Sequence, residues 1–347
     1  MATIITGLAL LAIILALFSL FSMKAPKGSL AMSGLANAAV VTFLVEAVHK
    51  YISGGLFGIS FLEEVGAVAG NMGGVAAAAL VAINMGTNPV FALAAGVAVG
   101  GYGILPGFLV GYFVGLIAPY VEKSLPKGLD LIAGVLALAP VARFAAMVVD
   151  PGVTVVLTYI GTTITAATQQ SPLVMGFLLG GIMKMICTSP LSSMALTAML
   201  GLTGLPMGIA AIACFGGSFT NGMIFARLHL GDRGNIIAVM LEPLTQAHII
   251  TKHPVPIYTS NMLGGGLAGM GAAFLGIINN APGTASPIPG MLAPFAFNDP
   301  LKVVLALVIA ALGGTLAGLL GSLVFRKWDQ NRNPSSASAM PTDPANS

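Results

Sequence analysis

A single carboxylate stands where an apolar run is interrupted. Glu242 follows the apolar residues 236–241 and directly precedes Pro243. A bare carboxylate is costly in such surroundings, and a proline removes a backbone donor and loosens the local helix. We therefore expect Glu242 to accept hydrogen bonds from sugar hydroxyls or to bind a coupling proton or cation. The alternative is a helix-end glutamate that faces a water-filled vestibule.

Two further polar side chains follow closely. Gln246 comes four residues after Glu242, which places both on one helix face if the helix resumes after Pro243. His248 can donate a hydrogen bond to a ligand or titrate near neutral pH. An ordinary loop role is the open alternative for His248.

Hydroxyl and amide groups gather at two other points. Asn221 lies in the glycine-rich stretch 216–222, which we interpret as a helix break, and an amide donates and accepts at once, as a polyol requires. Hydroxyls in membrane helices often bond only to the carbonyl of the preceding turn, but a concentration of four at one break favours a ligand. The four surround Pro190 and are Thr188, Ser189, Ser192 and Ser193.

The chain is poor in charge for its length. Its 347 residues include 14 Lys and Arg and 11 Asp and Glu, 56% are hydrophobic, and the mean hydropathy is +0.96. Charged residues make up 7%, against about 25% in a soluble domain, which excludes a soluble globule and a disordered chain. The net charge of +3 without a basic run argues against a nucleic-acid partner. We expect an integral membrane protein.

Apolar stretches long enough to cross a bilayer recur along the sequence. A spanning helix needs about 20 residues, so we expect about ten transmembrane helices, with 89–118 either one kinked helix or two pieces. Lys184 lies near the end of its stretch, where we expect its ammonium to reach the membrane surface. The basic residues after the last stretch place the C-terminus in the cytoplasm. The stretches are 3–22, 31–49, 65–84, 89–118, 131–149, 152–168, 172–187, 191–215, 235–250, 256–278 and 301–325.

The character of the chain changes near residue 170. The apolar stretches before it are regular, whereas 186–300 is interrupted by Pro, Gly and polar groups. Interrupted backbone is tolerated at membrane depth only inside protein or beside water, and it builds the substrate sites of secondary transporters. We therefore expect the transport site within 186–300. Residues 326–347 are expected to form a disordered cytoplasmic tail.

Three short motifs carry a family resemblance. They are Ser189-Pro190-Leu191-Ser192-Ser193, the stretch from Gly216-Gly217-Ser218 to Asn221-Gly222, and Leu241-Glu242-Pro243-Leu244-Thr245-Gln246. Together they resemble the membrane-embedded IIC component of bacterial sugar phosphotransferase systems. The resemblance covers roughly residues 30–325. It is strongest to stand-alone IIC-like proteins, some of which are described as regulators of toxin production.

The resemblance implies an all-α polytopic fold with an elevator architecture. It implies a homodimer built on an N-terminal scaffold (1–170) and a transport part (171–325) with two re-entrant hairpins that moves as a rigid body. The sugar-contacting Glu of the family's Gly-x-Thr-Glu-Pro motif corresponds to Glu242. Two features depart from the pattern: Val239, Met240 and Leu241 precede Glu242, and no His lies between His49 and His229, where the family has its second sugar contact.

These observations predict a multi-pass transporter of a sugar or polyol in the bacterial inner membrane. Phosphorylation would need a separate IIB phosphocarrier, because the sequence contains no IIB-like domain. A membrane solute sensor or regulator, and an ion-coupled secondary transporter in which Glu242 carries a proton, remain the alternatives. No GxSxG, HExxH or Walker sequence occurs, so we expect no catalytic residues, cofactor or metal. The expected solute contacts are Glu242, Gln246, Thr188, Ser189, Asn221 and His248.

Overall fold

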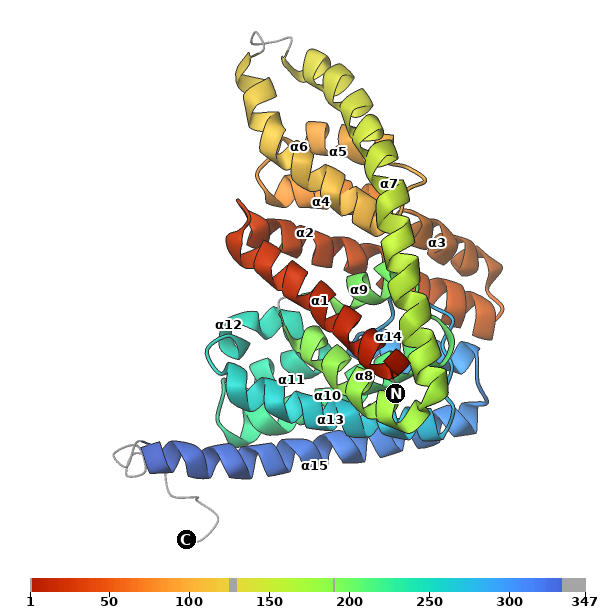
Figure 1. Ribbon diagram of the computed structural model, residues 1–347, viewed down its shortest axis with the longest axis vertical. Helices are drawn as coiled ribbons and strands as arrows, with labels where there is room; N and C mark the ends of the chain where they lie inside the picture. Colours follow the sequence, from red (N-terminus) through yellow and green to blue (C-terminus); the bar gives the residue numbers. More distant parts are fainter. Residues whose placement is uncertain (1, 125–129, 190, 333–347) are drawn as a thin grey trace.

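The structure, a computed structural model, describes residues 2–124, 130–189 and 191–332. Within these residues 85% are helical and none lies in a strand, which confirms the all-α prediction. Figure 1 shows two groups of helices, an upper and a lower one, connected by the long helix α7. Pro190 and residues 333–347 lie outside the described part.

The first group follows the chain from the N-terminus to α7. Two successive π-helices interrupt its second membrane segment, and π-helical turns occur frequently at functional sites. The elements are α1 (Ala2–Lys24), α2 (Gly28–Ala39), the π-helices η1 (Val40–Leu44) and η2 (Glu46–Leu56), α3 (Ser60–Asn71), α4 (Gly73–Asn84), α5 (Pro89–Ala98), α6 (Ile104–Ser124) and α7 (Asp130–Gln170).

The second group is more fragmented, as the distribution of Pro, Gly and polar residues predicts. Short helices and 3₁₀ turns alternate with long helices. The elements are α8 (Pro172–Thr188), α9 (Ser193–Met199), α10 (Gly204–Arg227), α11 (Arg233–Leu241), η3 (Pro243–Gln246), α12 (Ala247–Ile250), α13 (Pro254–Phe274), α14 (Pro287–Leu292), η4 (Ala293–Ala296) and α15 (Pro300–Arg332).

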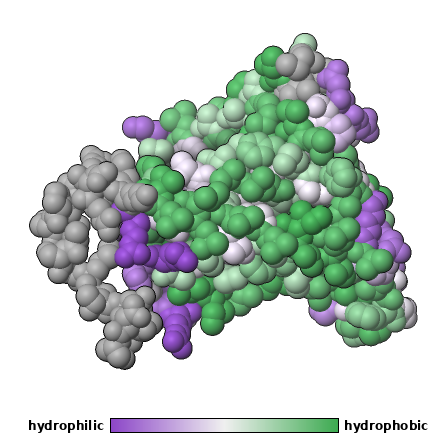
Figure 2. All heavy atoms as spheres, turned by 90° about the horizontal axis from the view of Figure 1, so that it is seen from below, coloured by the Kyte–Doolittle hydropathy of each residue, from purple (hydrophilic) through white to green (hydrophobic). Residues whose placement is uncertain are grey.

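Six helices of the described residues are long and apolar enough to cross a membrane, or seven if the bent pair α3–α4 counts as one span. The two helices of that pair meet at 57°. Two shorter apolar helices, α5 and α8, accompany them. The predicted count of about ten is therefore not confirmed, whereas a multi-pass arrangement is. Figure 2 shows hydrophobic residues over most of the face seen from below, as lipid contact requires.

Three local predictions were wrong. Residues 131–149 and 152–168 are not separate spans, because α7 continues through Pro140 and Pro151 for 41 residues. The glycine-rich stretch 216–222 is not a break but the interior of α10. The tail does not begin at 326, since α15 continues to Arg332. Prolines are tolerated in membrane helices where neighbouring groups satisfy the freed carbonyls.

The hydrophobic core of the second group also takes side chains from the start of the chain. Leu11 and Ile14 of α1 and Ile164 of α7 pack in one cluster with Leu179 of α8 and Ile209 of α10. Conversely, α9 of the second group packs into the hydrophobic cluster of the first group that α2, α4 and α6 form. The two groups therefore share α1, α7 and α9 as their contacts.

Glycines bring α8 and α13 into contact along their backbones. A Cβ added at Gly180 of α8 would lie 2.6 Å from the carbonyl oxygen of Gly265 and 2.9 Å from Cα of Gly269. Small residues are the usual means of helix association in lipid, where apolar side chains gain little by leaving the bilayer. These two helices are consequently positioned with little freedom, and they carry several of the polar groups described next.

Candidate functional site

Glu242 stands at a break between two helices. α11 ends at Leu241, the backbone of Glu242 is extended (φ −148°, ψ 96°), and Pro243 begins η3. Its carboxylate accepts a hydrogen bond from the Leu244 N–H at 3.5 Å and one from the Ser286 hydroxyl at 3.3 Å. A carboxylate offers about four acceptor positions, and both bonds are long. Much of the acceptor capacity of Glu242 is therefore unused.

A small cavity of about 20 Å³ lies beside this carboxylate. Ser192, Ser193 and Ser286 line it together with Glu242, and α2 and η1 of the first group close it. One water needs about 10–15 Å³, whereas small-molecule pockets measure about 300–1,000 Å³. The cavity beside Glu242 is therefore closed in this structure and too small for a sugar.

Lys184 of α8 is fully buried, with 0% of its surface exposed, instead of reaching the membrane surface as predicted. Its ammonium donates to the carbonyl oxygen of Cys214 at 3.3 Å. Gly217 of α10 and Gly265 of α13 leave room for its stem, because a Cβ on either would meet its methylene groups. Among the described residues no carboxylate lies within salt-bridge distance of Lys184.

A row of buried amides and a hydroxyl runs from Lys184 across three helices. Thr188 of α8 donates to the Lys184 carbonyl at 3.0 Å and accepts from the amide of Asn221 of α10 at 3.4 Å. Asn261 of α13 donates to the side-chain oxygen of Asn221 at 2.6 Å. The side-chain oxygen of Asn261 itself has no partner among the described residues. The structure thus brings together Thr188 and Asn221, two predicted site residues, within intact helices.

The other three predicted site residues make local contacts. Gln246 is buried and its side-chain oxygen accepts from the amide of Asn235 at 2.8 Å, which ties η3 to α11. His248 is exposed on α12. Ser189 donates to the Ile186 carbonyl at 2.8 Å, one turn back. Of the six predicted residues, Glu242 alone lines the closed cavity, and solute binding by the other five stays a prediction.

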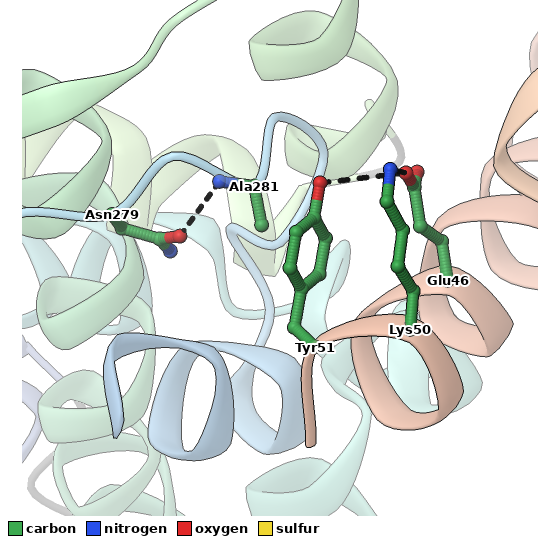
Figure 3. A network of polar contacts seen from close by, with 5 residues as sticks. All are labelled: Glu46, Lys50, Tyr51, Asn279 and Ala281. Carbon is green, nitrogen blue, oxygen red and sulfur yellow. Dashed lines mark hydrogen bonds and ion pairs between the residues drawn. The ribbon is translucent and has the colours of Figure 1, made fainter. Parts of the chain in front are cut away.

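The segment 279–286 reaches the cavity through Ser286. Figure 3 shows Asn279 of this segment, whose side-chain oxygen accepts from the Ala281 N–H at 2.9 Å, and the polar residues of the π-helix η2. On η2, Lys50 and Glu46 form a salt bridge of 2.7 Å, and the Tyr51 hydroxyl donates to Glu46 at 3.4 Å. Ser286 ends the segment 279–286 and donates to Glu242, so this segment contributes directly to the surroundings of the carboxylate.

Three polar residues of this region were missed by sequence reasoning. Lys184 was placed at a span end, although it follows two glycines that allow close packing. Asn261 directly follows Thr259 and Ser260, and Ser286 lies in the stretch that opens with Asn279 and Asn280, but neither belongs to a recognisable motif. The signal that could have identified them is an intramembrane polar group, which is costly unless it has a partner or a function.

Comparison with known proteins gives one match. The model of the family described as "Phosphotransferase system, EIIC" matches residues 29–335. Neither a curated protein nor a solved structure matches the chain. The matched range contains the closed cavity, Lys184 and the buried polar row.

Proposed function

The chain belongs to the EIIC family of the phosphotransferase system, and from this premise we propose that it moves a sugar or polyol across the bacterial inner membrane. The family and the apolar helices make it a multi-pass membrane component of sugar transport. The solute, the movement and the coupling are the parts proposed here.

The carboxylate of Glu242 is the observation that carries the proposal. It lies at a helix break, retains acceptor capacity, and faces a cavity whose other polar groups are serine hydroxyls. Sugars are recognised by such a combination, because each hydroxyl both donates and accepts, and a carboxylate is the strongest acceptor available.

We also propose that α8, α10, α13 and α15 move together as an elevator against α2, η1 and η2. Two features support this. The four helices share one hydrophobic core, with α8 and α13 held by backbone contacts at Gly180 and Gly265. The cavity is closed by helices of the opposite group. Movement of these four helices, together with the parts of α1 and α7 that pack in their core, would therefore open the site.

Two partners complete the proposal. A second copy of the chain forms a homodimer through the first group of helices. A IIB phosphocarrier supplied in trans phosphorylates the solute. One alternative is favoured by a particular observation: within the described residues Glu242 has no salt-bridge partner, so it can bind a proton or cation that drives ion-coupled transport instead.

Uptake by proteoliposomes tests these proposals. The purified chain is reconstituted and presented with labelled hexoses and polyols, with and without a proton gradient, and with and without IIB protein. Sugar phosphate as the product supports phosphotransfer, and free sugar alone contradicts it. Dependence on the proton gradient supports ion coupling. Binding without uptake contradicts transport and favours the sensor.

Glu242→Gln is the decisive variant. Hydrogen bonds to a charged group contribute about 1.5–3 kcal/mol, so we expect solute binding about tenfold to a hundredfold weaker. Glu64→Gln is the matched control, because Glu64 is exposed on α3, and its uptake should equal that of the wild type. If Glu242→Gln binds and transports as the wild type does, the proposed site is wrong.

A further inference from the structure

A second cavity differs in its lining from the one beside Glu242. It lies where α10 ends and α13 begins, next to the last part of α15. It has a volume of about 330 Å³. A smaller cavity of about 210 Å³ adjoins it and shares Arg227, His229 and Arg326. We call the two together the basic cavity. Its size is that of a small-molecule site, unlike the closed space beside Glu242.

The described lining of the basic cavity carries basic side chains and no acidic one. Three helix ends supply them: Arg227 from α10, Arg326 from α15, and Lys252 and His253 from the segment before α13. Asp232, three residues after His229, caps α11 by accepting from the Asn235 N–H at 2.8 Å. The described lining therefore carries positive charge, which favours an anion.

His229 adds an unusual feature. Its backbone is left-handed, with φ 52°, at the end of α10 where the Leu230 N–H bonds the Phe225 carbonyl at 2.9 Å. Glycine is the residue that usually occupies this position of a helix end. A side chain at this position is strained, so its retention beside Arg227 is consistent with a role for the imidazole.

The rest of the lining is apolar and leads into the membrane-facing side of α15. Leu228, Val255 and Phe325 line the cavity. Leu320 and Leu323 of α15 are 55% and 50% exposed on the stretch that precedes Arg326. An acyl chain can lie along these side chains while its headgroup reaches the basic residues. Figure 2 shows hydrophilic residues beside the end of α15, with hydrophobic surface next to them.

We propose that the basic cavity binds the phosphodiester headgroup of an anionic phospholipid, with the acyl chains along α15. Basic pockets between membrane helices on the cytoplasmic side bind such headgroups, and the positive residues place this end in the cytoplasm. A free phosphate shares the headgroup's charge but makes no use of the apolar lining. The bound lipid would connect α10 and α15 to Lys252, which follows the broken segment that contains Glu242.

Fluorescence of a single tryptophan in the cavity lining tests the proposal: Phe325→Trp, combined with Trp328→Phe so that no other tryptophan remains. The full chain carrying both substitutions is reconstituted in phosphatidylcholine bilayers that contain a small fraction of brominated phosphatidylglycerol or, separately, brominated phosphatidylcholine. We expect the anionic lipid to quench this tryptophan more strongly than the neutral one at equal fraction. Equal quenching by the two lipids overturns the proposal.

Two variants and one additive sharpen the test. Arg227→Gln with Lys252→Gln should weaken the preference for the anionic lipid about thirtyfold, at the strength typical of two basic residues near an anionic surface. Arg233→Gln is the control, because Arg233 is exposed at the start of α11 and does not line the cavity. An unchanged preference in the double variant overturns the proposal. So does loss of the preference when inorganic phosphate is added at the ionic strength of a chloride control, since free phosphate would then be the ligand.

Discussion

Replacing Lys184 by methionine separates the cost of its buried charge from the packing of its stem. The ammonium has one hydrogen bond, to the Cys214 carbonyl, and is fully buried. That carbonyl also accepts from the Ser218 hydroxyl at 3.3 Å, so it keeps a partner when the ammonium is removed. Methionine retains an unbranched stem between Gly217 and Gly265. We therefore expect Lys184→Met to be more stable than the wild type.

The magnitude follows from the same contacts. Replacing buried ionic groups by apolar residues of similar size is often stabilising by about 1–4 kcal/mol. Lys184→Ala removes the charge too but leaves the space of the stem empty, and truncations of this kind cost about 2–5 kcal/mol. The free energy of unfolding should therefore be higher for Lys184→Met than for Lys184→Ala, by about 2–5 kcal/mol.

Thermal unfolding in one detergent measures both effects. Lys302→Met is the control, since the Lys302 ammonium also bonds a backbone carbonyl, that of Gly276 at 3.4 Å, but is exposed; its stability should change by less than about 0.5 kcal/mol. A lower melting temperature for Lys184→Met than for the wild type would refute the reasoning, because the buried ammonium would then be a net stabilising group.

The remaining predictions concern the glycines and the polar row, and thermal unfolding measures each. Gly217→Ala should cost about 1–3 kcal/mol, because the added Cβ meets the stem of Lys184, and less in a Lys184→Ala background; an equal cost in both backgrounds would contradict the clash. Gly152→Ala, where a Cβ meets open space, should instead stabilise by up to about 1 kcal/mol. Asn221→Ala should cost about 1–3 kcal/mol by leaving Thr188 and Asn261 short of partners. Asn261→Ala added to it should cost less than the sum of the two, and strict additivity would show that the row is not coupled.

The helical class, the fragmented second half and the isolation of Glu242 could all be predicted from the sequence, because lipid allows few charges and few breaks. Continuity was harder to predict. The stretches 131–149 and 152–168 were expected to be separate spans, yet α7 passes through Pro151 between them. The glycines of 216–222 suggested a break, yet they serve close packing: a Cβ at Gly216 would lie 2.6 Å from the side chain of Ala268. A small residue that breaks a helix in water can instead pack helices together in lipid.

The site was predictable only one residue at a time. Glu242 can be recognised in the sequence by its charge in an apolar run and by the proline that follows it, and Asn221 by its amide. Their neighbours do not, because Lys184, Asn261 and Ser286 come from distant parts of the chain. Whether a lysine near a span end reaches water or is buried depends on residues 33 and 81 positions further along, Gly217 and Gly265, which leave room for its stem. Such pairings require the tertiary structure.

The packing of α1 sets an order of events during synthesis. Leu11 and Ile14 find their partners on α7, α8 and α10, so α1 must await chain made about 150 residues later. At about 5–20 residues per second that is a delay of about 8–30 s. The part of α1 that can span the membrane is strongly apolar, and 11% of it is buried inside the protein. Such a helix is suited to lie in lipid until these partners arrive. A polar substitution on α1 should therefore act first on insertion and assembly, before any effect on the finished transporter.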